Sequence, residues 1–167
     1  MGSFERALSI VLEHEGGDKF TDDPLDGGGA TRFGISQIAH PAVDVRNLTR
    51  EGAAAIYRAE YWQPMHCDEL PAPLALCVFD SAVNQGRAAA TRMLQDAVGA
   101  TVDGVLGPKT LAAIYRHPTD RLLRRFMTAR AQRYIATGGF ATFGRGWIAR
   151  TLDVAMTAAE WEMEDAE

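Results

Sequence analysis

The stretch FERALSIVLEHEGG, residues 4–17, decides how the fold begins. Its apolar residues recur at the spacing of one helix face, which predicts an amphipathic helix over residues 4–15 with Phe4, Ala7, Leu8, Val11 and Leu12 inward. Glu15 comes eleven positions after Phe4 and, at about 100° per residue, returns to within about 20° of the Phe4 direction. We therefore expect the Glu15 carboxyl at the helix end on the side of the core, and burial there favours its protonated form.

The position of Glu15 suits a general acid, which must still hold its proton near neutral pH. From periodicity alone the favoured interpretation is a plainer one, in which a helix-terminal glutamate is bonded to nearby backbone N–H groups. The stretch TDDPLDGGGAT, residues 21–31, strengthens the catalytic interpretation because its glycines let the chain approach a ligand closely. One of its carboxylates can hold a water molecule that Thr31 positions. A calcium loop is the alternative, but the EF-hand spacing is not met.

The rest of the chain is helical nearly throughout, so the predicted fold class is all-α, with a single globular domain over residues 1–167. The glycine-rich residues 16–36 form a long loop with room for short strands. Helix signals follow in order: Thr49 as the N-cap of a helix through Trp62, a helix from Pro71-Ala72-Pro73 to about Asn84 ended by Gly86, a helix over 87–98 closed by Gly99, one from Pro108 to about Arg116, one capped by Thr119 and ended by Gly138-Gly139, and one over 143–163.

Composition narrows the class of protein. The chain is 47% hydrophobic and 23% charged, which is ordinary for a globular protein, and no apolar run is long enough to insert into a membrane. The net charge of −5 argues against nucleic acid as a partner. Residues 116–150 nevertheless hold eight arginines and one acid; they suit either solvated helix faces, which we slightly favour, or contact with an anionic polymer. The net negative charge also disfavours an all-α DNA-binding protein that uses helix 119–137.

Cellular context and oligomeric state are expectations from the same sequence. The two cysteines, Cys67 and Cys77, are too few for a disulfide framework and lack metal-site spacing, so we expect buried, reduced thiols. The N-terminal residues do not resemble a secretory signal. We expect a monomer that is made in the cytoplasm and reaches the cell wall through a holin-type membrane lesion or by cell lysis.

The N-terminal motif resembles the signature of glycoside hydrolase family 108. It consists of Glu15-Gly16-Gly17, then Asp23-Pro24-x-Asp26-x-Gly28-Gly29-x-Thr31, then Gly34-Ile35-Ser36. Weaker similarities continue in the expected order at Tyr61-Trp62, residues 79–86, 103–110, 130–134 and 143–147, so the resemblance covers nearly the whole chain. The family contains phage endolysins and related N-acetylmuramidases, bacteriolytic enzymes with a lysozyme-like helical fold.

The resemblance implies a catalytic set. The glutamate of the family motif corresponds to Glu15, while Asp26 and Thr31 match the aspartate and threonine that accompany it in phage-type lysozymes. Ten residues separate Glu15 from Asp26, and Asp18-Lys19 resembles a two-residue insertion relative to the family. Phe20 then takes the place of an aromatic residue near the substrate. Because of the insertion, Asp23 remains the alternative to Asp26 as the second carboxylate.

The implied reaction is hydrolysis of the β-1,4 bond between N-acetylmuramic acid and N-acetylglucosamine in peptidoglycan, without a cofactor or a metal. Glu15 protonates the leaving oxygen, and Asp26 with Thr31 steers water to the far face of the sugar. A held water favours inversion over retention. A lytic transglycosylase and a non-catalytic peptidoglycan-binding protein on the same fold are the alternatives.

Further residues are candidates for contact with the glycan strand. Aromatic faces suit sugar rings, which singles out Tyr61 and Trp62, although a place in the core is at least as good an interpretation. The amides of Asn84 and Gln85 suit acetamido groups or, equally, helix capping. Within the single domain we expect a catalytic region over 1–85 and a helical region over 86–167. Residues 103–110 resemble peptidoglycan-binding motifs, but a turn that leads into Pro108 is preferred.

Overall fold

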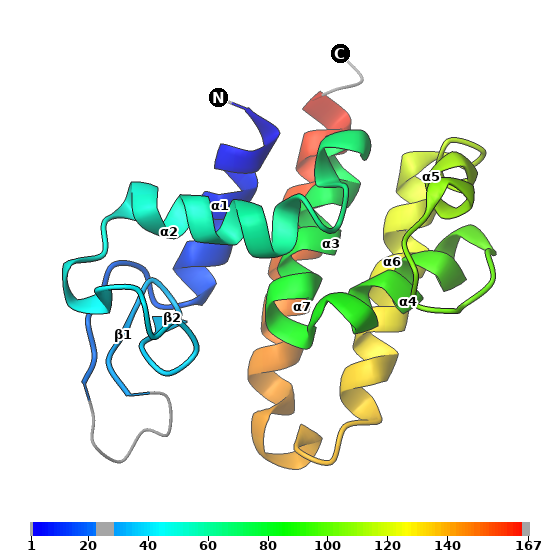
Figure 1. Cartoon of the computed structure of the whole chain (residues 1–167). Helices are drawn as coiled ribbons and strands as arrows, with labels where there is room; N and C mark the ends of the chain where they lie inside the picture. The colour runs from blue at the N-terminus through cyan, green and yellow to red at the C-terminus, as the bar shows by residue number, and fades with distance from the viewer. Residues whose placement is uncertain (1, 23–28, 165–167) are drawn as a thin grey trace. The chain divides into compact units, whose positions relative to one another are not determined.

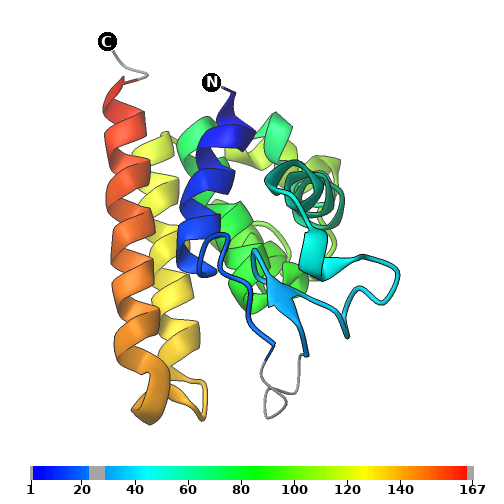
Figure 2. The same cartoon turned by 90° about the vertical axis from the view of Figure 1, so that its left-hand side faces the viewer.

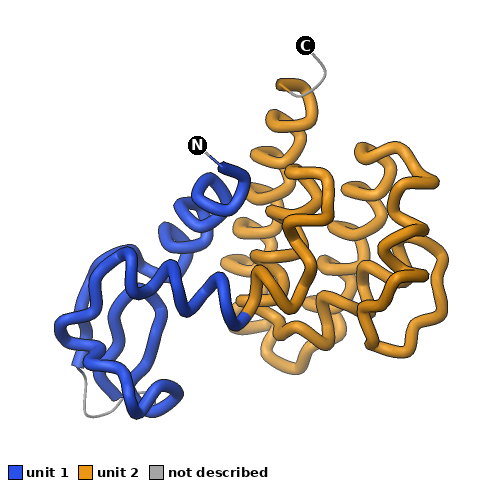
Figure 3. The backbone as a smooth tube through the Cα atoms, turned by 45° about the horizontal axis from the view of Figure 1, so that its top comes forward, with its two compact units in different colours: residues 1–60 blue, residues 61–167 orange. Residues whose placement is uncertain are grey.

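The computed structural model describes residues 2–22 and 29–164 (Figure 1). Its described residues form seven α-helices, several short 3-10 and π segments, and one two-stranded hairpin, which confirms the predicted all-α class. The backbone separates into two compact units, residues 1–60 (unit 1) and residues 61–167 (unit 2) (Figure 3). The predicted internal division after residue 85 is a different boundary and stays a prediction.

Unit 1 begins with α1 (Ser3–His14), which buries the five apolar residues that the sequence predicts. The helix ends at the two glycines. Gly16 and Gly17 have φ values of +92° and +66°, and the Gly17 N–H donates to the Leu12 carbonyl over 2.8 Å. Glycine adopts positive φ without the steric cost of a side chain, so this pair turns the chain sharply away from the axis of α1. Glu15 is thereby the last residue before the turn.

A β-hairpin lies inside the stretch predicted as a glycine-rich loop. β1 (Thr31–Arg32) pairs antiparallel with β2 (Ile35–Ser36), with Thr31 opposite Ser36 and Arg32 opposite Ile35. Phe33 and Gly34 form the two-residue connection, with φ values of +54° and +74°. Positive φ at both positions is the pattern of a type I′ turn, which matches the twist of a hairpin. Phe33 keeps this unfavourable conformation while its side chain is buried in unit 1.

The second helix of unit 1 is α2 (Arg50–Tyr57), which follows a short 3-10 helix, η1 (Val45–Asn47). The Thr49 hydroxyl accepts a hydrogen bond from the Gly52 N–H over 3.1 Å, which confirms the predicted N-cap. The helical run reaches Trp62 as predicted, but its last turn, η2 (Arg58–Trp62), is a π-helix.

Unit 2 contains the remaining helices, and α6 and α7 run side by side within it (Figures 1 and 2). Two predictions are wrong at helix ends. Thr119 is not a cap, because Pro118 takes the N-cap position and Thr119 is already helical. The last helix begins at Phe140 and not at 143, directly after the glycine pair. The elements are η3 (Cys67–Glu69), α3 (Ala72–Gln85), α4 (Arg87–Val98), α5 (Pro108–Ile114), α6 (Thr119–Ile135) and α7 (Phe140–Glu164).

A buried ion cluster joins three helices of unit 2. Asp80 on α3 is fully buried and accepts from Arg130 of α6 over 2.6 Å. The Arg150 guanidinium of α7 reaches the same carboxylate through Nε at 3.0 Å and Nη2 at 2.7 Å. Two of the eight arginines in the stretch 116–150 therefore face inward, which neither interpretation of that stretch, solvated helix faces or contact with an anionic polymer, predicts. A carboxylate shared by two guanidinium groups fixes how the three helices pack.

The two cysteines, Cys67 and Cys77, are free thiols and are buried, as predicted. Burial raises the pKa of both thiols, that of Cys77 to about 12. None of the described helices combines the length and the apolar character needed to cross a bilayer.

Candidate active site

The predicted catalytic glutamate lies where α1 meets the hairpin tip. Glu15 is half-buried, and its N–H donates to the Val11 carbonyl over 3.0 Å, which keeps it on the last turn of the helix. Gly34 packs directly against it. A Cβ placed on Gly34 would lie 2.8 Å from the Glu15 Cβ and 2.7 Å from the Tyr57 hydroxyl, closer than non-bonded atoms approach. The tip of the hairpin therefore approaches the Glu15 side chain as closely as only glycine permits.

Tyr57 fixes the hairpin tip in this position. Its hydroxyl donates to the Phe33 carbonyl over 2.9 Å, and its side chain is only 3% exposed. The bond links α2 to the turn that holds Gly34, so the end of α1, the turn and α2 meet at one point. No local signal in the sequence predicts this bond, because the partner is a backbone atom 24 residues earlier.

Thr31 belongs to the same hairpin as the turn that contacts Glu15. Its backbone exchanges two hydrogen bonds with Thr21, of 2.9 and 2.8 Å, and its hydroxyl donates to the Gly29 carbonyl over 3.1 Å. A hydroxyl that donates to a carbonyl still has an oxygen that accepts. The half-buried Thr31 can therefore orient a water molecule by accepting a hydrogen bond from it.

Arginines within unit 1 contact residues 18–22, which precede Asp23 in the sequence. The Arg46 guanidinium lies 4.6 Å from the centre of the Phe20 ring and 3.0 Å from an Asp22 carboxylate oxygen. Arg32 donates to the carbonyls of Asp18 and Arg46. Phe20 thus has a cation over its ring, and the segment with the predicted insertion is held in place. Asp23 and Asp26, the two candidates for the second carboxylate, lie outside the described residues.

The two aromatic candidates of unit 2 differ in exposure. Trp62 is 1% exposed, its Nε1–H donates to Asp68 over 2.7 Å, and its ring meets Phe79 edge-to-face at 5.4 Å. These contacts place it in the core of unit 2, in line with the alternative interpretation of the sequence, and we leave it out of the proposed substrate contacts. Tyr61 is half-buried on the π-helical turn and keeps its candidacy.

Asn84 and Gln85 end α3, but Gly86 and not either amide provides the helix cap. An Arg130 N–H donates to the Tyr134 hydroxyl over 3.4 Å, and that hydroxyl in turn donates to Asn84 Oδ1. The amide oxygen of Asn84 is thereby used, and its Nδ2 is the group left to donate to a ligand. Tyr134 also stacks on Trp147 with ring centres 5.0 Å apart, which fixes the direction of its hydroxyl.

The described residues 2–22 and 29–164 contain no cluster of three or more His, Cys, Asp or Glu side chains suited to a metal ion. The chemistry that the described geometry itself offers is that of a carboxyl and a hydroxyl near one hairpin. Such groups can transfer a proton and orient water.

Comparison with known proteins places this geometry in context. Residues 8–86 match the protein family described as "Glycosyl hydrolase 108", and residues 89–152 match the one described as "Predicted Peptidoglycan domain". The solved structure of SagA from Brucella abortus is similar over 99% of both chains, with 36% sequence identity and a TM-score of 0.85. No curated protein matches the chain.

Proposed function

Because the chain belongs to the glycosyl hydrolase 108 family, and is thereby a lysozyme-like glycosidase that acts on peptidoglycan, we propose that it is a muramidase. In this proposal it hydrolyses the β-1,4 bond from N-acetylmuramic acid to N-acetylglucosamine. The observation that carries the proposal is the packing of Gly34 against the Cβ and Cγ of Glu15, because this contact limits where the stem of the side chain can lie.

Glu15 is the general acid in this mechanism. The leaving sugar oxygen must gain a proton as the glycosidic bond breaks, and a carboxylic acid within hydrogen-bond reach supplies it. The hairpin tip packs against the Cβ and Cγ of Glu15, and the bond from Tyr57 holds that tip in place. Fixing the acid beforehand removes part of the entropy cost of reaching the transition state.

Asp26 and Thr31 act on water in the same mechanism, with Asp23 as the alternative carboxylate. The carboxylate takes one proton from the water on the far face of the sugar as its oxygen bonds to the anomeric carbon. The Thr31 hydroxyl oxygen accepts a hydrogen bond from the other O–H of this water and so sets the direction of attack. We expect inversion at the anomeric carbon, which NMR of the first-formed anomer tests. Comparison of Asp26→Asn with Asp23→Asn assigns the second carboxylate, since only the residue that activates water should abolish turnover.

The decisive test of the acid compares two neighbouring glutamates. Glu15→Gln keeps the size of the side chain but removes the proton, and we expect the release of reducing sugars from purified sacculi to fall by about 10²–10⁴-fold. Glu13→Gln is the matched control, because Glu13 is exposed on the same helix end and should stay near wild type. Equal activity of the two variants would exclude Glu15 as the acid.

Product analysis separates hydrolysis from the lytic transglycosylase reaction. A hydrolase adds water and leaves a reducing muramic acid, whereas a transglycosylase closes the 6-hydroxyl onto the anomeric carbon and leaves a 1,6-anhydro end. Mass spectrometry resolves these products by the mass of one water molecule. We expect reducing ends with muramic acid at the terminus, and anhydro ends would contradict the hydrolytic proposal.

A further inference from the structure

A groove with a volume of about 950 Å³ opens in unit 2 between the end of α4, the loop over residues 99–107 and α5. This volume lies in the range of small-molecule binding sites. Short apolar side chains, Val98, Ala100 and Ala113, line part of it, and polar groups line the remainder. The groove falls entirely within the segment 89–152 that matches the peptidoglycan domain.

One side chain braces the loop that forms a wall of the groove. Gln95 on α4 is 1% exposed. Its Nε2 donates to Asp103 over 2.6 Å and to the Val105 carbonyl over 3.0 Å, and its Oε1 accepts from the Gly104 N–H over 2.8 Å. A wall fixed by three hydrogen bonds to one buried amide is formed before a ligand arrives, which lowers the entropy cost of binding.

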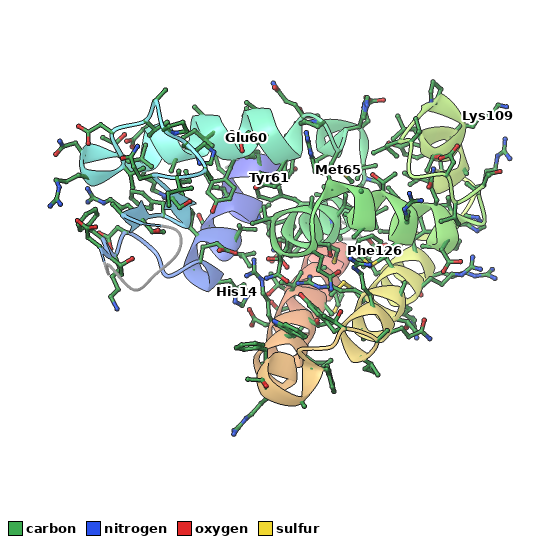
Figure 4. The ribbon with its side chains drawn as sticks, turned by 60° about the horizontal axis from the view of Figure 1, so that its bottom comes forward. His14, Glu60, Tyr61, Met65, Lys109 and Phe126 are labelled. Carbon is green, nitrogen blue, oxygen red and sulfur yellow. The ribbon has the colours of Figure 1, made fainter. Side chains whose placement is uncertain are left out.

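Positive charges outnumber negative ones among the described residues that line the groove. Lys109 and Arg116 are exposed at its edge, and Lys109 is seen on α5 in Figure 4. His117 donates from Nε2 to the Val98 carbonyl, which leaves Nδ1 for other partners. Among the described residues that line the groove Asp103 is the one acid, and its Oδ1 already accepts from the Val105 N–H and from Gln95; these bonds lower its pKa. The groove is thus basic although the whole chain has a net charge of −5.

The lining also indicates which part of peptidoglycan suits the groove. Sugar rings are bound on aromatic faces, and the described residues that line the groove include no Phe, Tyr or Trp. Stem peptides instead present alanine methyl groups and free carboxylates. Short apolar side chains next to a lysine and an arginine complement both features, because these cations form charge-assisted hydrogen bonds with carboxylates.

We propose that this groove binds the stem peptide of peptidoglycan, with Lys109 and Arg116 on its carboxylates. The inference extends the proposed function, since it assigns the peptide to unit 2 while the glycan is cleaved at Glu15. It does not depend on Glu15 being the acid, so the two proposals can fail separately.

The experiment uses the full chain as Glu15→Gln, which prevents turnover during titration. The two probes are the reduced disaccharide tetrapeptide released from sacculi and the same disaccharide without its peptide. Binding is followed by ¹H–¹⁵N NMR for the parent and for a variant that adds Lys109→Gln and Arg116→Gln. The control adds Arg121→Gln and Arg133→Gln, which removes the same charge from exposed positions on α6. A parallel assay measures hydrolysis of peptide-free glycan strands by the chain with an intact Glu15.

We expect the Lys109/Arg116 pair to weaken binding of the peptide probe at least about tenfold, as for the loss of about one charged hydrogen bond, with shifts concentrated at residues 98–117. The control pair should bind like the parent, and hydrolysis of peptide-free strands should not change. Equal weakening by the control pair, equal binding of the probe that lacks a peptide, or absence of binding by the parent would each overturn the assignment. If the groove variants bind normally while Glu15→Gln is inactive, only the peptide site is wrong.

Discussion

Replacing Gly34 by alanine should affect both stability and catalysis, and the structure supplies the magnitude. The residue has a φ of +74°, where a Cβ costs about 1–2 kcal/mol. The new methyl would also lie 2.7 Å from the Tyr57 hydroxyl and 2.8 Å from the Glu15 Cβ. Relieving such overpacking costs about 1–3 kcal/mol, so the free energy of unfolding should fall by about 2–5 kcal/mol. Since Glu15 must move, kcat should fall on the order of 10²-fold.

Gly99→Ala is the matched control for the stability measurement. Gly99 has nearly the same φ, +70°, but a Cβ there meets no atom within 4 Å. Urea denaturation of both variants therefore separates the backbone cost from the contact with Glu15 and Tyr57, which we expect to account for about 1–3 kcal/mol. If Gly34→Ala costs no more than Gly99→Ala and retains its kcat, the hairpin tip does not confine the glutamate, and the reasoning is wrong.

Three further predictions concern single side chains. Asp80→Asn leaves the buried Arg130 and the largely buried Arg150 without their carboxylate, and it should reduce the free energy of unfolding by about 3–5 kcal/mol in urea titrations. The exposed Asp120→Asn should cost under about 1 kcal/mol, and similar values for both variants would contradict the burial argument. Tyr57→Phe removes the bond to the hairpin carbonyl and should cost about 1–3 kcal/mol together with a lower kcat, while an unchanged kcat would show that the bond does not position the acid. The thiols of Cys67 and Cys77 have raised pKa values in the folded chain, so above the ordinary thiol pKa of about 8.5 they ionise in the unfolded chain first. The free energy of unfolding should therefore be constant below about pH 8.5 and fall as the pH rises above it. Thermal melts from pH 7 to 10 test this, and a melting temperature that does not change over this range would refute it.

Local signals in the sequence predicted much of the backbone. Periodicity predicted α1, and the residues that end or begin helices were recognised where their chemistry is specific, as at Thr49, Gly99 and Pro108. The prediction of Thr119 as an N-cap is wrong, because threonine is favoured at that position in general but Pro118 occupies it here. Such signals operate over a few residues, so they predict elements better than contacts between elements.

The contacts that define the candidate site were beyond local reasoning. The contact of Gly34 with Glu15 joins residues 19 positions apart, and no periodicity predicts it. The arginines of the ion cluster lie 50 and 70 residues after Asp80, and in the sequence they are indistinguishable from their solvated neighbours. Burial of a charge depends on its partner, and the partner is brought near only by the tertiary fold.

The ion cluster also connects the two family segments. Asp80 belongs to the segment 8–86, whereas both of its arginine partners belong to the segment 89–152. A fragment cut between them would separate the buried Asp80 carboxylate from both of its cationic partners. Neither segment can therefore be exchanged for that of a relative unless the replacement offers the complementary charge.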